Sequence, residues 1–417
     1  MGLREFLDCL KKEGSLQEIN KPISPIFEAP RYAYQDKRPI LFHDCNGMRA
    51  AMNVLNSREM LAKALGVTPD NIINKLTNTT FNGQVKHVDK SPMLEVRSKA
   101  CLSKLPIMKH FKKDGGSYIT AGIVVSKYKD MYNASIHRLM MVNDNTLAAR
   151  LVPPRHTYVM QKEAASKNEP LQVGIVIGVD PVTVFAASTR VPQGKEWEYA
   201  AALKGEPIEL IRLDNGVEVP HGEIVLEGSI DPSEKVKEGP FVDITGSYDH
   251  IRPEPVIHLT NMMMRKDPIY HGILPGGNEH KLLMGVPYEP LIFNAVANVT
   301  KVKNVMLTEG GCCYLHAIVQ IEKQTEGDGK NAIMAAFAAH TSLKHVVVVD
   351  ADINIFDPMD VEYAIATRTK ADRDVMIVSN VRGSSLDPVS DDNITSKMGV
   401  DATKPLKASE KYERAKI

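Results

Sequence analysis

The sequence predicts a mixed α+β and α/β protein, in which a central block of antiparallel strands lies between an N-terminal α/β segment and a C-terminal α/β domain. Three features predict it: a length of 417 residues, a middle stretch of short β-rich runs, and a later stretch in which helical and strand patterns alternate. A chain of this length normally divides into two or three domains of roughly 100–200 residues each.

The N-terminal segment, residues 1–98, combines helical patterns ("LREFLDCLKKEG", "SREMLAKALG") with one short strand pattern ("RPILFHD"). This mixture indicates a small α/β unit. The next stretch, "LSKLPIMKHFKKDGGSYIT", contains a proline and a Gly-Gly turn. Such residues interrupt regular structure, so we interpret it as the entry to the second domain.

The middle block, residues 99–275, consists of short β-rich runs separated by Gly, Pro, Asn and Asp. This spacing is typical of a barrel or sandwich of antiparallel strands. The expected strands include "AGIVVSKY", "QVGIVIGVD", "VTVFAAS", "GEIVLEGSI" and "VIHLTNMMM".

The third block, residues 276–390, alternates helical patterns such as "KNAIMAAFAAH" with strand patterns such as "YLHAIVQIEK". The β-branched run Val346–Val349 predicts a strand that is buried on both faces. Residues 391–417 are predicted to form a polar C-terminal tail.

Composition excludes several classes of partner. Lys plus Arg and Asp plus Glu each number 51, and no basic block is present, so nucleic acid is not expected. No apolar run approaches the roughly 18 residues that cross a bilayer. The first residues alternate charged and apolar side chains and lack the layout of a secretory signal, which predicts a cytoplasmic protein.

The five cysteines form no CxxC pair, so neither a disulfide framework nor a zinc knuckle is expected. Cys312 and Cys313 are adjacent, which could suggest redox chemistry. They open the apolar stretch "CCYLHAIVQI", however, and free cysteine is among the most buried residue types. We therefore predict that both are buried apolar residues.

Polar residues interrupt the strand pattern "YNASIHRLMMV". On a strand, Asn133, Ser135 and His137 share one face and Arg138 points to the other. Taken alone, the stretch is more simply an edge strand with a hydrated face.

Two further stretches carry chemistry-bearing side chains. In "LVPPRHTYVM", two prolines lead into Arg155 and His156, and "VPQGKEWEYAAALKGEP" places Glu196 at the start of an Ala-rich helix. An acid in a first helical turn is ordinarily a partner of the helix dipole. Taken together, the amide of Asn133, the imidazole and the carboxylate suit Mn²⁺ or Mg²⁺ better than structural zinc, with coordination positions left for a phosphate. No Walker motif and no GxGxxG followed by a helix is present.

The stretch "EGPFVDITG" places Glu238 and Asp243 on either side of a Gly-Pro pair. Pro240 disfavours a helix here, so a tight turn can direct both acids to one site. An arginine between two acids keeps one of them ionised while the other cycles its proton. Arg138 is the candidate for that arginine.

These four stretches, in this order, resemble the UbiD family of decarboxylases, which use prenylated FMN. The matching motifs are "NASIHR", "PPRH", the Glu196 that opens the Ala-rich helix, and "EGPFVD", supported by "KKDGGSYIT", "EIVLEGSI" and "SKMGVDAT". The resemblance covers nearly the whole chain. It implies that residues 99–275 form a split β-barrel, similar to that of flavin reductases, which binds prenylated FMN.

The resemblance also implies a site. Asn133, His156 and Glu196 would bind a divalent ion, typically Mn²⁺, that holds the cofactor phosphate. Glu238, Arg138 and Asp243 would be the catalytic group, with Asp243 transferring the proton and Glu238 tuning Arg138. The implied cofactor-binding residues are Asn133, Ser135, Ile136, Arg138, Arg155, His156, Ser188 and Glu196.

The compact length resembles the archaeal branch of the family, which implies an α,β-unsaturated acid bearing a phosphate as substrate. His280, Lys281 and Arg155 are the candidates for binding that phosphate. A flavin prenyltransferase would supply the cofactor, the chain would form a homo-oligomer through its C-terminal part, and K⁺ is a candidate second ion.

The chain departs from the family pattern in places. The second acid is Asp243, where some relatives have Glu, and a lysine that some relatives place near the flavin has no clear match, with His340 and Lys344 as the nearest substitutes. Three alternatives stay open: decarboxylation of an aromatic (polyprenyl-)hydroxybenzoate, an FMN-binding reductase or flavin carrier, and metal-dependent hydrolysis. The last two leave an arginine flanked by acids unexplained.

Overall fold

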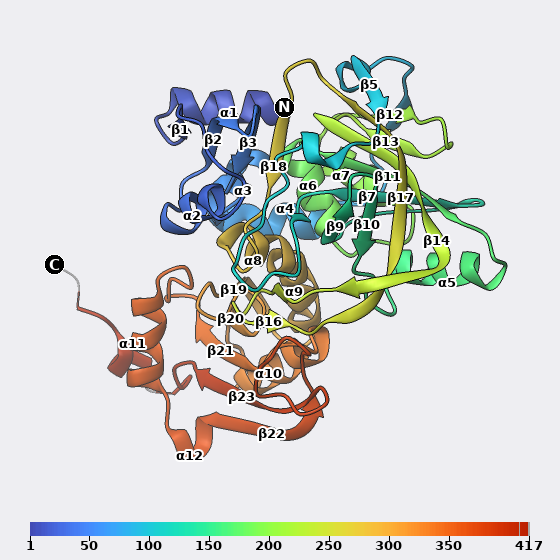
Figure 1. The fold of residues 1–417 in the computed structure, drawn as a ribbon. Helices are drawn as coiled ribbons and strands as arrows, with labels where there is room; N and C mark the ends of the chain where they lie inside the picture. The colour runs from blue at the N-terminus through green and yellow to red at the C-terminus, as the bar shows by residue number, and fades with distance from the viewer. Residues whose placement is uncertain (408, 416–417) are drawn as a thin grey trace. The chain divides into compact units, whose positions relative to one another are not determined.

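The computed structural model describes residues 1–407 and 409–415, which form two compact units (Figure 1). The first unit contains residues 1–69 and 79–280, and the second contains residues 70–78 and 281–417 apart from the undescribed positions. The N-terminal segment therefore belongs to the same unit as the β-rich block, apart from residues 70–78. The fold is mixed α and β, as predicted.

The first unit is dominated by a nine-stranded antiparallel sheet. Its long central strands β14 and β17 run side by side (Figure 1). The strands follow the order β6 (Tyr118–Ile119), β9 (Leu139–Asn143), β10 (Thr146–Ala149), β17 (Arg252–Met264), β14 (Ile224–Glu238), β11 (Leu171–Ile177), β7 (Ile123–Tyr128) and β8 (Met131–Ile136), with β5 (Val96–Lys99) paired to β17. Within the described part of the chain, no pairing joins β6 to β8.

Smaller sheets and helices complete the first unit. A four-stranded sheet has the order β1 (Gln17–Ile19), β2 (Ile40–Cys45), β3 (Met48–Met52) and β18 (Ile269–Gly272). Two more sheets contain β13 (Glu218–Pro220), β12 (Ile208–Arg212) and β4 (Val85–His87), and β15 (Phe241–Val242) and β16 (Tyr248–Asp249). The helices are α1 (Leu3–Lys12), α2 (Glu28–Gln35), α3 (Arg58–Leu65), α5 (His156–Ser166), α6 (Pro181–Ser188) and α7 (Glu196–Lys204), with 3₁₀ turns η2 (Pro92–Leu94) and η3 (Leu102–Lys104).

The strand prediction for "VTVFAAS" is wrong, because these residues form α6. The Asp180 side chain caps this helix by accepting a hydrogen bond from the backbone N–H of Thr183 at 3.0 Å. Pro181 occupies the first helical turn. Both are favoured residues at a helix start, and together they outweigh the β-branched character of the run.

The second unit is a five-stranded mixed sheet with helices. The strand order is β19 (Lys301–Leu307), β20 (His316–Glu322), β21 (His345–Asp350), β23 (Ile394–Ala402) and β22 (Val375–Arg382). Its helices are α4 (Ile72–Asn78), α9 (Glu289–Ala297), α10 (Asp328–Ala339), α11 (Pro358–Arg368) and α12 (Ala371–Asp374), with turns η4 (Val286–Tyr288) and η5 (Ser409–Tyr412). Two of the three boundaries between the units lie within turn η1 (Pro69–Asn71) and helix α8 (Asn278–Gly285), and the third follows the end of α4.

Two predictions for the C-terminal part have different outcomes. Val346–Val349 lie in the central strand β21 and are all buried, and they alternate between two apolar clusters, as predicted for a strand covered on both faces. Residues 394–402, assigned to a polar tail, instead form β23 next to β21. Lys397 and Asp401 gave that stretch its polar appearance, yet both are buried.

All five cysteines are free thiols. Cys313 is buried, as predicted, whereas Cys312 is partly exposed. None of the helices formed by the described residues has both the length and the apolar character needed to cross a bilayer.

Candidate active site

Arg138 is held among three carboxylates. It lies in the connection between β8 and β9, and its Nη2 donates to Oε2 of Glu238 at 2.8 Å. Glu238, the last residue of β14, is fully buried. Asp243 follows β15, and its Oδ2 lies 3.8 Å from Nη1 of Arg138. The structure therefore brings together the three residues that the sequence analysis selected as the catalytic group.

The third carboxylate, Asp249 on β16, was missed by the sequence analysis. Its Oδ2 lies 3.0 Å from Nη2 of Arg138 and 2.6 Å from Nη1 of Arg252. Burial raises the pKa of Asp249, but the hydrogen bond from Arg252 and the charge of Arg138 outweigh it and lower the pKa to about 2. The segment "YDHIR" contains both Asp249 and Arg252. An acid three positions before a base was the sequence feature that could have indicated this ion pair.

Aromatic rings and a close backbone contact surround this ion cluster. The hydroxyl of Tyr118 donates to Oε1 of Glu238 at 3.1 Å, and the guanidinium of Arg138 lies 4.9 Å from the Phe241 ring centroid. Gly115 donates its backbone N–H to the carbonyl of Pro240 at 2.9 Å. A Cβ on Gly115 would overlap the carbonyl oxygen of Gly239, so the chain needs glycine here. The turn that carries the acids is thus closely packed.

Asn133, His156 and Glu196 meet at a second point of the same unit. They come from β8, from the first residue of α5 and from the first residue of α7. One terminal atom of the Asn133 amide lies 3.1 Å from both Nδ1 of His156 and Oε1 of Glu196. With the amide oxygen on this side, three potential ligand atoms converge, whereas the reversed amide would donate to both Glu196 and His156. A divalent cation would satisfy all three, so this donor set fits the metal that the sequence predicts.

Burial changes the protonation of these side chains. Burial raises the pKa of Glu196 to about 7, although backbone N–H groups of Glu196, Ala134 and Gly194 oppose the change. Burial and the nearby charges of Arg190 and Arg155 lower the pKa of His156. A cation bound here would offset the cost of ionising the buried carboxyl. The neutral imidazole keeps a lone pair that can bind the same cation.

Next to this set lies a row of polar side chains, of which Thr157 and His137 are buried and Ser135 is partly buried. Nδ2 of Asn133 lies 3.0 Å from Oγ of Ser135 and 2.9 Å from Oγ1 of Thr157. Nε2 of His137 lies 2.9 Å from the Ser135 hydroxyl and 3.2 Å from the Thr157 hydroxyl. Burial lowers the pKa of His137 to about 4. Asn133, Ser135 and His137 therefore share one side, as predicted, although β8 ends at Ile136.

Other residues implied for cofactor or substrate binding have local partners. Ser188 ends α6 and donates its hydroxyl to the carbonyl of Val184 at 2.9 Å. Arg155 immediately precedes α5 and has an exposed side chain. Nδ1 of His280 accepts the N–H of Gly276 at 3.0 Å.

The two substitutes proposed for the missing lysine are engaged elsewhere in the second unit, where Lys281 also lies. His340 is buried and stacks on Tyr288 with ring centroids 4.1 Å apart, and Lys344 forms an ion pair of 2.9 Å with Asp387. These partners give each residue a structural role in its own unit.

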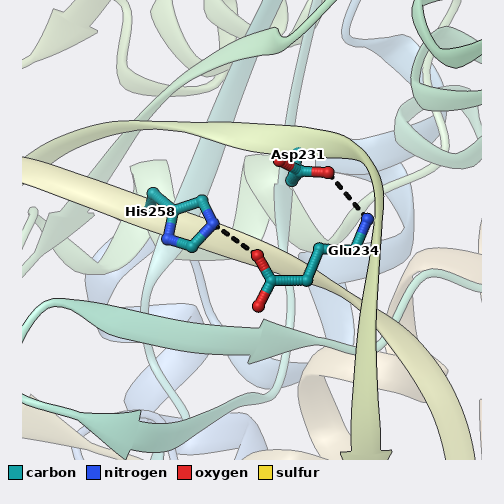
Figure 2. Close-up of side chains that lie close together, drawn as sticks. All are labelled: Asp231, Glu234 and His258. Carbon is teal, nitrogen blue, oxygen red and sulfur yellow. Dashed lines mark hydrogen bonds and ion pairs between the residues drawn. The ribbon is translucent and has the colours of Figure 1, made fainter. Parts of the chain in front are cut away.

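A separate acidic cluster lies on β14 and β17, and it was not predicted (Figure 2). Nε2 of His258 lies 2.8 Å from Oε2 of Glu234, and Oδ1 of Asp231 accepts the N–H of Glu234 at 2.7 Å. His258 and Glu234 are exposed. These hydrogen bonds account for the proximity of the three side chains where β14 bulges between Ile230 and Lys235.

The fold and the arginine–carboxylate site define a class of enzyme. The model of the 3-octaprenyl-4-hydroxybenzoate carboxy-lyase Rift-related domain matches residues 85–278, and the N-terminal and C-terminal domain models of the same lyase match residues 7–79 and 281–402. The chain belongs to the UbiD family of carboxy-lyases.

Beyond the family, the chain is similar to individual named proteins and to solved structures. The chain is 63% identical to anhydromevalonate phosphate decarboxylase of Methanosarcina mazei, across 100% of this chain and 99% of the relative. It is 51% identical to the protein of that name from Archaeoglobus fulgidus, across 88% of this chain and 86% of the relative. Among solved structures, the UbiD-class enzyme HmfF from Pelotomaculum thermopropionicum in complex with FMN has a TM-score of 0.97 and 38% identity, covering 100% of this chain and 97% of that one. An evolved dimeric form of HmfF in complex with prFMN has a TM-score of 0.92 and 36% identity, with the same coverage.

Proposed function

We propose that the chain catalyses the non-oxidative decarboxylation of trans-anhydromevalonate 5-phosphate to isopentenyl phosphate and CO₂, with prenylated FMN as cofactor, in an archaeal mevalonate pathway. The observation that carries the proposal is Arg138, paired to the buried Glu238 at 2.8 Å and lying 3.8 Å from Asp243. The 63% identity to a relative named for this reaction supports the choice of substrate.

The cofactor would bind in the first unit. In this proposal the nine-stranded sheet is the split β-barrel that contacts the flavin. Asn133, His156 and Glu196 hold a Mn²⁺ or Mg²⁺ ion that binds the cofactor phosphate, and the convergence of their acceptor atoms supports this. When bound, prenylated FMN supplies the electron sink that loss of CO₂ requires.

The chain's own residues position the substrate and move one proton. Glu238 and Asp249 hold Arg138 in a fixed orientation, in which its guanidinium can bind the substrate carboxylate. Asp243 is farther from Arg138 than the other two acids, so its carboxyl is the least engaged in ion pairs, and we assign to it the proton that is transferred. Oδ2 of Asp243 delivers that proton to the carbon that loses the carboxyl group, as a general acid.

The remaining parts of the proposal concern binding partners. Arg155, His280 and Lys281 are the candidates for contacting the substrate phosphate. A flavin prenyltransferase supplies the cofactor, and the chain assembles as a homo-oligomer. An aromatic hydroxybenzoate decarboxylase is less well supported, because two relatives of 63% and 51% identity are named for anhydromevalonate phosphate.

The test is co-expression of the chain with a flavin prenyltransferase, followed by absorption spectroscopy and mass determination of the bound flavin. We expect prenylated FMN, and CO₂ release from anhydromevalonate phosphate but not from 4-hydroxybenzoate. If the protein binds unmodified FMN and this form supports full turnover, the proposed cofactor is wrong. If the protein releases CO₂ only from the aromatic acid, the proposed substrate is wrong.

A further inference from the structure

We propose that His137 favours one orientation of the Asn133 amide, in which Asn133 presents its oxygen to the cation. This inference rests on the metal site of the proposed function. His137 touches none of the three atoms that would bind the metal, and it acts through the hydroxyl groups of Ser135 and Thr157. It is therefore a positioning residue.

The backbone carbonyl of Arg150 fixes which nitrogen of the His137 ring carries the hydrogen. Nδ1 of His137 lies 3.1 Å from the carbonyl oxygen of Arg150. A carbonyl oxygen can only accept, so Nδ1 must carry the hydrogen. The ring is buried and its ring nitrogens contact no carboxylate, so it is neutral. Nε2 of His137 can then only accept a hydrogen bond.

That acceptor orients two hydroxyl groups. The hydroxyls of Ser135 and Thr157 lie 2.9 and 3.2 Å from Nε2 of His137, and 3.3 Å from each other. Each hydroxyl has a single hydrogen, and one of the two hydrogens is taken up by Nε2 of His137. At most one hydroxyl hydrogen is then left to point towards Asn133.

Both hydroxyl oxygens can still accept a hydrogen bond from Asn133. The terminal atom of Asn133 on this side lies 3.0 Å from Oγ of Ser135 and 2.9 Å from Oγ1 of Thr157. An amide nitrogen has two hydrogens, one for each hydroxyl. The amide oxygen then faces His156 and Glu196, as a metal ligand should.

The reversed amide is the competing arrangement. It would donate to Glu196 and His156 at 3.1 Å each and would accept from Ser135, Thr157 and the N–H of Ala134. His137 takes up one of the two hydroxyl hydrogens, so the reversed amide oxygen can accept from only one hydroxyl, whereas the amide nitrogen can donate to both. The reversed arrangement also places N–H groups where the cation would bind. His137 thus favours the orientation that is competent to bind metal.

The test is a double-mutant cycle in Mn²⁺ affinity, measured by EPR titration of the full-length protein free of flavin and metal. His137→Phe removes the acceptor, so the amide can reverse, and we expect about a 10- to 100-fold loss of affinity. Asn133→Asp has an oxygen at either end. In the Asn133→Asp background, His137→Phe should therefore cost less than about threefold. His316→Phe, which alters a partly buried histidine of the second unit, is the control and should leave the affinity unchanged.

The outcomes separate the two proposals. An equal loss from His137→Phe in both backgrounds means that His137 acts only through packing, which overturns this inference alone. A wild-type protein that binds Mn²⁺ no better than Glu196→Gln rejects the metal site of the proposed function. Long-range ¹H–¹⁵N correlation on the unmodified protein, labelled at histidine, tests the inference without any variant. We expect His137 with hydrogen on Nδ1, and hydrogen on Nε2 instead would overturn the inference.

Discussion

Arg138 donates to Glu238 at 2.8 Å across 100 residues of sequence, and the accepting carboxylate is fully buried. A buried charged pair of this kind contributes little net stability, because desolvation offsets most of the attraction. The pair instead fixes the orientation of both side chains, because moving either one would leave a buried charge without its partner. The same guanidinium therefore reaches Asp243 and Asp249 from a fixed position.

The first prediction concerns Asp243. If this residue transfers the proton, Asp243→Asn should lower kcat by about 10²- to 10⁴-fold while prenylated FMN and metal remain bound. Asp243→Glu should retain more activity, because the carboxylate remains. The measurement is CO₂ release at saturating substrate, with flavin content read from the absorption spectrum. Asp231→Asn, a partly exposed acid of the same unit, is the matched control. Near-wild-type release by Asp243→Asn would remove this residue from the proton-transfer step.

The second prediction concerns Asp249 and pH. Its folded-state pKa of about 2 lies below the ordinary value, so the ionised form stabilises the fold. That contribution is complete above about pH 4, the unfolded-state range, and is lost as the pH falls towards 2. Asp249→Asn should lower the free energy of unfolding by a constant amount above pH 5, and the difference from wild type should shrink between pH 4 and 2. Chemical denaturation at several pH values measures it. A difference that persists unchanged at pH 2 contradicts the assignment.

The third prediction concerns the three proposed metal ligands. If Glu196 binds the metal, Glu196→Gln removes the ligand charge but keeps the size of the side chain, so Mn²⁺ and flavin should be lost together. Glu198→Gln, two residues later in the same helix, is the control, because Glu198 pairs with Lys195 at 2.7 Å. Metal analysis and flavin absorbance of the purified proteins report the result. Full retention of both ligands would leave Glu196 as an ordinary acid at a helix start.

The fourth prediction concerns His110. This residue is buried, and burial lowers its pKa to about 3. A histidine that stays neutral when folded but takes up a proton when unfolded weakens the fold as the pH falls below about 6.5. His110→Gln should therefore reduce the slope of unfolding free energy between pH 6 and 4 by about 1.4 kcal/mol per pH unit. An unchanged slope in denaturation curves would show that His110 is already accessible to protons.

The fifth prediction concerns Gly115. A Cβ here would overlap the backbone of Gly239, next to the turn that carries Glu238 and Asp243. Overpacking of this kind typically costs about 1–3 kcal/mol. Gly115→Ala should lower the free energy of unfolding by that amount and reduce turnover, because the turn must shift. Gly310→Ala is the control, since a Cβ there meets nothing within 4 Å. A fully active and stable Gly115→Ala protein would show that the turn tolerates displacement.

Much of the site was predictable because its signals are local. A carboxylate at the start of an Ala-rich run predicted the first residue of α7, and a Pro-Pro pair predicted that His156 follows a turn. Resemblance to a family then connected four separated stretches. The strand prediction for 182–188 failed because an Asp-Pro helix start outweighed β-branched residues. Asp249 was missed because neighbouring sequence does not reveal a partner 111 positions away.

By itself the sequence determined the mixed α and β character, the family, and which residue types could bind metal or carry a proton, because these depend on local pattern and motif order. The tertiary structure alone decided that Asp249 shares Arg138 with Glu238. It also decided that His137 faces two hydroxyls rather than solvent. Hydrogen-bond direction and ion pairing depend on distances of about 3 Å between distant parts of the chain, which only the packed fold sets.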